Sequence, residues 1–328
     1  MSSHRHLRSK LAPVIKRYVM LKRALGRHFE SESYYLARLD WFLASHKSDL
    51  TAASFSAWCS SFVHLTPSGR CQRMRIVYNL CLYRRRTEPD CFVPDRSQFP
   101  AAPPRLKPHI FTYDEIVRLL RTTEELAPNA LSPLHRQAAR LAIVLLYTTG
   151  LRRGEVVRLT LGDYNADERV LTVREAKFHK SRLVALSDDA VREMDCYLQH
   201  RRGPRFPSSG DSPLLLNNHG GLTAYTGPGF AMLIRKLFRR ANIRTAAGRL
   251  PRVHDLRFTF AVHALVRWYR EGADVQVRLP SLSIYMGHVS IASTQYYLSF
   301  LDDVGQAASE RFDRHCSRFL PEFARIAQ

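Results

Sequence analysis

The sequence predicts a mainly α-helical protein of two domains, with a small antiparallel β-sheet in the second domain. Three observations support this fold class. Apolar residues recur at helical spacing along much of the chain, a proline-rich stretch at 94–108 divides it, and the β-rich runs are two short neighbouring segments. The 328 residues also suffice for two domains, since a domain usually has ~100–200 residues.

The first domain is expected to be a small bundle of helices over residues 1–93. Leu36, Leu39 and Leu43 recur at the spacing of one helix face. Phe55, Trp58 and Phe62 repeat that spacing further on. Both patterns indicate amphipathic helices that bury one face against their neighbours.

Basic residues crowd the start and the end of this domain. They are Arg5, Arg8, Lys10, Lys16, Arg17, Lys22, Arg23, Arg27, Arg70, Arg73, Arg75, Arg84, Arg85 and Arg86. We interpret these two groups as surfaces that face phosphates, and Arg73 and Arg75 are the candidate contacts in the second group. For any single residue a merely solvated position is an equal alternative, because Lys and Arg are normally exposed.

Residues 94–109 are predicted to be a linker between the domains. Prolines interrupt helices and strand pairing there: Pro94, Pro100, Pro103, Pro104 and Pro108. The second domain then covers residues 110–300. The remaining residues, 301–328, form a tail with apolar residues at the spacing of one or two short helices.

The first two helices of the second domain are predicted from their ends. Thr112 suits an N-cap and Glu115 the third helical position, which together make a capping box. Ser132-Pro133 is expected to open the next helix, whose stretch 142–147 is apolar nearly all round and therefore buried. Gly150 suits the C-cap of that helix.

A β-hairpin is predicted after these helices. The β-rich runs 169–174 and 182–186 are joined by a basic tip at 175–181. Helical patterns resume after the hairpin at 190–198, 230–238 and 254–269.

The charge of the chain points to a polyanionic partner. Lys and Arg number 50 against 29 Asp and Glu, so the net charge is +21. Such a field attracts nucleic acids and makes binding steeply dependent on salt. An RNA-binding protein, a ribosome-associated factor and a soluble protein with a charged surface all fit this charge equally well.

The cysteines indicate a reducing compartment. The six cysteines form no Cys-x-x-Cys pair, and no secretory signal peptide precedes them. Cys71, Cys81 and Cys91 recur every ten residues, but without histidines at ligand spacing they suit a core better than zinc. No apolar run approaches the ~18 residues of a membrane helix. We therefore expect a soluble, cytoplasmic protein with no metal site.

Four motifs stand in a fixed order along the second domain. Residues 149–155 read Thr-Gly-Leu-Arg-Arg-Gly-Glu, and they are followed by a His-x-x-Arg motif, a Gly-His pair and a tyrosine. The polar residues of these motifs are Arg152, His254, Arg257, His288 and Tyr297. In this order, with Lys177 in the hairpin tip between the first two, they resemble the tyrosine recombinase or phage integrase family.

The resemblance covers the second domain and, more weakly, the first. It implies a C-terminal tyrosine-recombinase catalytic domain at 110–300 and an N-terminal helical core-binding (SAM-like) domain at 1–93. It also implies that the tail 301–328 docks on a neighbouring protomer, although packing within one chain fits the sequence as well. The stretch 268–285 is longer than in compact Xer-like members, which favours a recombinase of a mobile element.

The resemblance implies a role for each motif residue. Arg152 and Arg257 would bind the non-bridging oxygens of a phosphodiester, because a guanidinium is always charged and grips two oxygens. Lys177 would protonate the leaving 5′ oxygen. His288 would donate a hydrogen bond to the phosphate, and His254 would do the same or accept the tyrosine proton.

Tyr297 would be the nucleophile that forms a 3′-phosphotyrosyl bond. A phenol with a pKa of ~10 needs a base and nearby cations to attack. The spacing from His288 in the family motif selects Tyr297 over its neighbour Tyr296. The stored bond energy would make religation independent of ATP, and the chemistry requires no cofactor.

Some neighbouring residues compete for these roles. The match to the motif selects Arg152 over Arg153. His263 lies nine residues after His254, about 900° further round the helix, which places it on the opposite face. Glu155 lies one turn from Arg152 and would hold it or a histidine in place, and a surface ion pair is an even alternative. Lys180 and Arg182 are interpreted as contacts to the DNA backbone.

The expected function is that of a site-specific DNA recombinase. Its partner would be double-stranded DNA with inverted-repeat sites, bound by a homo- or hetero-tetramer. A type IB topoisomerase is the enzymatic alternative, since it shares the tyrosine, arginine and histidine chemistry. A non-catalytic DNA-binding accessory of another recombinase is the alternative from a different class.

Overall fold

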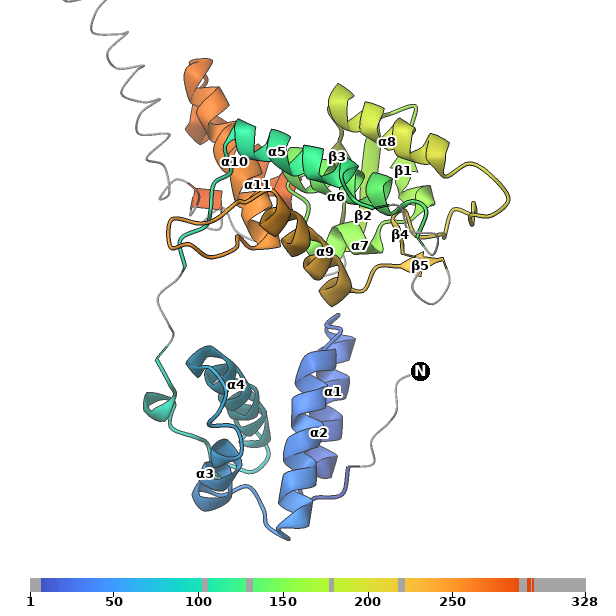
Figure 1. The fold of residues 1–328 in the computed structure, drawn as a ribbon. Coiled ribbons are helices and arrows are strands. Elements are labelled where there is room, and N and C mark those ends of the chain that lie inside the picture. The colour runs from blue at the N-terminus through green and yellow to red at the C-terminus, as the bar shows by residue number, and fades with distance from the viewer. Residues whose placement is uncertain are drawn as a thin grey trace, which may run out of the picture. The chain divides into compact units, whose positions relative to one another are not determined.

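The computed structural model describes residues 7–101, 106–127, 132–176, 180–217, 222–288, 294, 295 and 297. For residues 175, 176 and 180 the structure describes the backbone but not the side chains. The chain divides into two compact units, Met1–Leu106 and Lys107–Gln328. Each unit has its own hydrophobic core, and Figure 1 shows their elements.

The first unit is built from four helices. They are α1 (Ala12–Ala24), α2 (Glu30–Ser45), α3 (Ala52–Ser60) and α4 (Pro67–Arg84). Threonine side chains cap the N-termini of α3 and α4 by accepting hydrogen bonds from backbone amides of their first turns. The apolar faces expected from the sequence are buried, since Leu36, Leu39 and Leu43 are fully enclosed.

A short 3₁₀ helix, η1 (Arg96–Gln98), lies inside the segment expected to be a linker without helix. Asp95 caps it by accepting a hydrogen bond from the Ser97 amide. Both residues fall between Pro94 and Pro100, so one turn forms where no proline interrupts it.

The second unit contains seven α-helices and two small sheets among its described residues. They are α5 (Tyr113–Glu124), α6 (His135–Thr149), α7 (Arg153–Arg158), η2 (Leu161–Asp163), β1 (Tyr164–Asn165), β2 (Val170–Ala176), β3 (Lys180–Ala185), α8 (Asp188–His200), β4 (Leu216–Asn217), β5 (Thr223–Ala224), α9 (Gly227–Arg240), α10 (Val253–Arg270) and α11 (Val275–Met286). The fold class predicted from the sequence, mainly helical with a small antiparallel sheet, is confirmed.

The central helix of this unit is α6, which packs against α5, α8 and α10 (Figure 1). Of the stretch 142–147 that the sequence predicts to be buried, residues 142–146 are buried and Tyr147 is half-buried. The capping box of Thr112 and Glu115 at the start of α5 is confirmed. The expected start of α6 is wrong by a few residues: Ser132-Pro133 forms a turn, and the helix begins at His135.

The hairpin expected from the β-rich runs is present. β2 pairs with both β1 and β3 in antiparallel fashion, with a register shift between Val173 and Ala176 near its tip. The second sheet, β4 with β5, was not predicted, because two-residue strands leave no alternating pattern to detect.

Gly150 ends α6 and directs the chain towards the site. Its backbone is left-handed, with φ +62°. A Cβ atom on Gly150 would lie 2.5 Å from Cδ1 of Phe260 on α10. Only glycine therefore allows both this turn and this close approach of the two helices.

Candidate active site

The structure brings together five of the six predicted catalytic residues. Arg152 is the N-cap of α7, His254 and Arg257 lie in the first turns of α10, and His288 follows the C-cap of α11. Tyr297 lies against His288. The sixth, Lys177, lies outside the described residues, as does Tyr296.

Arg152 is held by both its backbone and its side chain. Its amide donates to Oε2 of Glu155 at 2.8 Å, and Nη1 donates to Oε1 of the same carboxylate at 2.8 Å. Nη2 donates to the Gly287 carbonyl at 2.9 Å. The side chain remains 34% exposed, so part of the guanidinium is open to a ligand. Arg153, its rival in the sequence, is exposed on α7.

Arg257 is a buried cation. The residue is 1% exposed, and its guanidinium donates to the carbonyls of Gly150 at 2.5 Å and Met286 at 2.6 Å. Loss of hydration and the neighbouring charge of Arg152 lower its pKa to about 10. The group stays charged at neutral pH, so the site holds two neighbouring guanidinium ions.

The two histidines share this positive environment. Burial and the Arg257 charge lower the pKa of His288 to about 4. The pKa of His254 is also lowered, by lost hydration and by Arg257, although the residue keeps exposed surface. Nδ1 of His288 lies 2.8 Å from Oγ1 of Thr294. Both rings are therefore neutral near pH 7, and each keeps one ring nitrogen that can accept a hydrogen bond.

The Tyr297 side chain is buried beside these groups. The residue is 3% exposed, and its hydroxyl lies 3.4 Å from Nε2 of His288. The Phe258 ring packs edge-on against it, with the centroids 4.9 Å apart. Burial raises the pKa of Tyr297, while the Arg257 charge opposes that rise. The phenol is thus protonated at neutral pH and needs a base to become a nucleophile.

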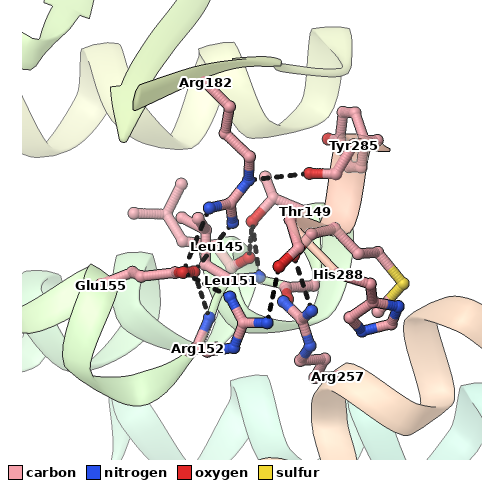
Figure 2. A network of polar contacts seen from close by, with 12 residues as sticks. Leu145, Thr149, Leu151, Arg152, Glu155, Arg182, Arg257, Tyr285 and His288 are labelled. Carbon is pink, nitrogen blue, oxygen red and sulfur yellow. Dashed lines mark hydrogen bonds and ion pairs between the residues drawn. The ribbon is translucent and has the colours of Figure 1, made fainter. Parts of the chain in front are cut away.

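Glu155 is buried, so the expected alternative of a surface ion pair is wrong. The residue is 4% exposed, and its carboxylate binds Arg152 and also Arg182 (Figure 2). Burial alone would raise its pKa, but hydrogen bonds from Arg182 and from the Arg152 amide outweigh burial and lower the pKa to about 2. The carboxylate holds arginines rather than a histidine.

Arg182 was interpreted as a contact to the DNA backbone, but its side chain is paired with protein oxygens instead. Its side chain is 10% exposed. Its two terminal nitrogens donate to Glu155 at 3.1 and 2.9 Å, and Nε donates to the Tyr285 carbonyl at 2.9 Å. The sequence gives no sign of these contacts, because the partners lie 27 and 103 residues away along the chain. The side chain of Lys180 lies outside the description.

His263 lies away from this site, as its helical rotation predicts. Its Nδ1 lies 3.2 Å from the Tyr147 hydroxyl, and its ring is tilted against that of Tyr113. Pairing with two tyrosines of α6 and α5 accounts for this histidine without a role in the site.

The two basic candidates of the first unit differ in setting. Arg75 is exposed and lines a cavity of about 590 Å³ between α1 and α4. Arg73 is half-buried, with its guanidinium over the rings of Tyr35 and Phe62 at 4.9 and 5.3 Å. Arg73 is therefore engaged in cation–π contacts, and Arg75 is the more accessible cation.

The described parts of the chain contain neither a metal-binding cluster nor a membrane-spanning helix. No group of three or more His, Cys, Asp or Glu residues has an arrangement that suits a metal ion within these parts. Over the same residues, no helix is both long and apolar enough to cross a membrane.

Comparison with known proteins identifies the family. The sequence model of the phage integrase family matches residues 109–302. The chain belongs to the phage integrase family. The resemblance to tyrosine recombinases drawn from the motifs is thereby confirmed.

Relatives of this integrase-family chain match it along most of its length. The putative integrase/recombinase y4rB of Sinorhizobium fredii is 30% identical over 309 residues, which cover 93% of this chain and 98% of that protein. The tyrosine recombinase XerD of Rhizobium meliloti is 30% identical over 273 residues, or 80% of this chain and 81% of XerD.

A solved structure shares the fold. The Tn1549 transposon integrase in complex with transposon right end DNA superposes with a TM-score of 0.60 at 18% identity, covering 91% of this chain and 98% of that one. This likeness concerns the fold alone.

Proposed function

We propose that this protein is a site-specific DNA recombinase that cleaves and rejoins DNA through Tyr297. The observation that carries the proposal is the placing of the Tyr297 hydroxyl 3.4 Å from a neutral imidazole and beside a buried guanidinium. A cation pair suits a phosphodiester, and a buried phenol beside a base suits attack on phosphorus.

In the proposed reaction the Tyr297 oxygen attacks the scissile phosphorus. The phenol proton passes to the neutral ring of His288, which takes this role in place of the phosphate hydrogen bond expected for it, because its Nε2 lies beside the hydroxyl. The new bond joins the tyrosine to the 3′ phosphate, and the bond to the 5′ oxygen breaks. The leaving oxygen takes up a proton and departs as a hydroxyl. Attack of a 5′ hydroxyl from another strand reverses these steps, so no phosphodiester energy is lost and ATP is not needed.

The arginines would stabilise the charge that develops on phosphorus oxygens. A guanidinium has five N–H donors, and Arg152 and Arg257 each use two terminal nitrogens on protein oxygens. The remaining donors suit the non-bridging oxygens of the pentacoordinate transition state. His254, beside Arg257 on the same helix, would add a hydrogen bond to the phosphate. The proton for the leaving oxygen is proposed to come from Lys177, on the family resemblance alone.

Double-stranded DNA is the proposed partner of both units. The solved integrase with the same fold is in complex with transposon DNA. In the first unit the charged and amide residues that line the cavity between α1 and α4 are four cations, two amides and one acid: Lys22, Arg27, Arg75, Arg86, Gln72, Asn79 and Glu32. The pKa of Lys22 is lowered by lost hydration and by the charges of Arg27 and Arg86. Such mutual repulsion among cations is relieved when a polyanion binds.

Residues 1–93 are accordingly proposed as the core-binding domain and 110–300 as the catalytic domain. Assembly on inverted repeats is proposed to be a tetramer, of this chain alone or with sister recombinases. The tail 301–328, expected to dock on a neighbouring protomer, lies outside the described residues. Sedimentation of the protein on a duplex with two inverted sites, compared with one site, measures this assembly.

A nicked suicide substrate tests the proposed chemistry. The duplex carries inverted repeats from the DNA flanking the gene, and the nick lets the short cleaved fragment diffuse away. Wild-type protein is expected to form a covalent adduct that resists denaturation. Tyr297→Phe should form none, and Tyr296→Phe is the matched control that should still form it.

Two outcomes would contradict the proposal. One is the absence of an adduct from wild-type protein on a duplex that it binds specifically. The other is an adduct that persists in Tyr297→Phe. Relaxation of supercoiled plasmid by a monomer without recombinant products would instead support the topoisomerase alternative.

A further inference from the structure

Three arginines bind three consecutive backbone carbonyls at the end of α11. The donors and acceptors are Arg182 Nε to Tyr285 at 2.9 Å, Arg257 Nη2 to Met286 at 2.6 Å and Arg152 Nη2 to Gly287 at 2.9 Å. Figure 2 shows these three guanidinium groups converging from different elements. The three donors come from β3, α10 and α7, so this turn joins three parts of the unit.

The end of a helix is a suitable place for such cations. The last carbonyls of a helix have no partner within it, and the helix dipole makes this end negative. The turn after α11 also carries His288, whose amide donates to the Ser283 carbonyl at 2.9 Å. The position of the His288 ring therefore depends on how this turn is held.

Arg182 differs from the other two arginines because the protein uses every nitrogen of its guanidinium. Nε binds the Tyr285 carbonyl, and the terminal nitrogens bind both oxygens of Glu155. Glu155 in turn binds the amide and the side chain of Arg152. Arg182 is thus connected to a phosphate-binding arginine through Glu155 and to His288 through the α11 turn.

Gly287 makes this arrangement possible. Its backbone is left-handed, with φ +66°, and a Cβ atom there would lie 2.9 Å from Nη1 and 3.0 Å from Cζ of Arg182. Any side chain at this position would displace the guanidinium group. The turn and Arg182 are therefore fitted to each other.

We propose that Arg182 is a positioning residue for strand cleavage, which aligns Arg152 through Glu155 and His288 through the Tyr285 carbonyl. The proposal rests on the proposed function, because it concerns the rate of that reaction. Arg182 acts through other residues, since all three nitrogens of its guanidinium donate to protein oxygens.

Single-turnover cleavage at saturating DNA tests this role. Arg182→Gln is expected to slow formation of the Tyr297 adduct by about 10- to 100-fold, since small misplacements of catalytic groups cost about this much. The Kd for DNA should change by less than about threefold, because Arg182 is not a phosphate contact. Arg169→Gln, which removes an exposed arginine of the same hairpin, is the matched control and should cleave at the wild-type rate.

Arg182→Lys separates geometry from charge. A lysine keeps the charge but cannot bind two carboxylate oxygens and a carbonyl in one plane, so it should cleave about as slowly as Arg182→Gln. Wild-type cleavage by either variant would overturn the proposal. So would a loss confined to Kd, which would show a DNA contact, or a loss of rate that merely follows a lower Tm.

Hydrogen exchange in the free protein tests the same link without the reaction. Gly287→Ala and Arg182→Gln should both speed exchange of the amides of Gly287 and His288 by about tenfold or more, because opening of the turn becomes easier. Gly272→Ala is the matched control: its φ is +76° and its Cβ would have no neighbour within 4 Å. Unchanged exchange in Arg182→Gln would overturn the proposal.

Comparison of adduct formation by wild-type protein and by Arg182→Gln also separates a failure of this proposal from a failure of the proposed function. If wild-type protein forms no adduct, the proposed function fails and the role in cleavage fails with it. If wild-type protein forms the adduct and Arg182→Gln forms it equally fast, only the positioning role fails.

Discussion

Arg257 is a buried cation, and a residue that replaces it would have to donate the same hydrogen bonds. Its terminal nitrogens bind the carbonyls of Gly150 and Met286, so one side chain joins the end of α6 to the end of α11. A lysine would retain a charge there but would lose the planar set of donors.

We expect Arg257→Lys to lower the rate of strand cleavage by roughly 10²- to 10³-fold, which is the usual cost of removing one fixed donor to a developing oxyanion. Arg267→Lys, an exposed position on the same helix, is the control and should leave the rate unchanged. Quenched single-turnover assays on the suicide duplex measure both. A rate within threefold of wild type for Arg257→Lys would contradict this role.

His288 makes folding sensitive to mild acid. Its pKa is about 4 in the folded protein, below the ~6.5 of an unfolded histidine. The unfolded chain therefore takes up a proton first as the pH falls from 7 to 5, which lowers the free energy of unfolding. Partial exposure of the ring reduces the effect to about 1 kcal/mol. Glu155, with a pKa of about 2, adds its own loss only below about pH 4.5.

We expect His288→Gln to lose less stability than wild type between pH 7 and pH 5. Urea unfolding at the two values measures the difference, and His200→Gln, an exposed histidine on α8, is the control. Equal pH dependence in His288→Gln and wild type would contradict the lowered pKa.

At the scale of elements, Gly150 allows α6 to end close against α10, beside the site. Gly150 combines a left-handed backbone with contact to Phe260, whereas Gly272 has a left-handed backbone in open space. An alanine at Gly272 suffers only the cost of a left-handed backbone, about 1–2 kcal/mol. An alanine at Gly150 adds a steric clash that costs about 1–3 kcal/mol more.

We therefore expect Gly150→Ala to lower the free energy of unfolding by more than Gly272→Ala does, by about the cost of that clash. Chemical denaturation of the two variants measures this difference directly. Equal losses would show that α10 moves away from the added methyl without cost, and the packing argument would then be wrong.

The sequence predicted the elements whose signals are local. The capping box of Thr112 and Glu115 and the C-cap at Gly150 are confirmed because each depends on residues within one turn. α11 was not predicted as a helix. It contains Pro280, and a proline within a helical pattern normally indicates an end.

Contacts between distant elements explain what the sequence did not show. The motif selected Arg152 and Arg257. Their side chains, however, are held by carbonyls that lie 135 and 29 residues away in the sequence. Arg182 was placed on a DNA-facing surface for the same reason, because a basic hairpin tip gives no sign of a buried acid. Burial of Glu155 is likewise a tertiary property.

At the scale of the whole molecule, the proposed binding of DNA rests on the charge of +21 and on the cavity between α1 and α4. We expect the affinity for duplex DNA to fall steeply with salt, with a slope of about −0.9 per phosphate contact. Arg75→Gln should reduce the magnitude of that slope by about 0.9, the value for one phosphate contact. Arg118 is an exposed arginine of α5, and Arg118→Gln should leave the slope unchanged. Fluorescence anisotropy across a salt series measures the slopes, and an unchanged slope for Arg75→Gln would contradict the contact.

An amide in the same cavity is expected to read bases. Asn79 is exposed one helical turn after Arg75, on the same face of α4. An amide can bind an adenine edge through two hydrogen bonds. Asn79→Ala should reduce the preference for specific over shuffled DNA by about 1–3 kcal/mol with the salt slope unchanged. An equal loss on both DNAs would show that Asn79 does not read sequence.

Mapping of the covalent linkage tests the central claim most directly. The trapped adduct is digested, and the peptide that carries nucleotide is sequenced by mass spectrometry. We expect the phosphate on Tyr297, joined to a DNA 3′ end, with a free 5′ hydroxyl on the released strand. A linkage to another residue, or to a DNA 5′ end, would contradict the proposed mechanism.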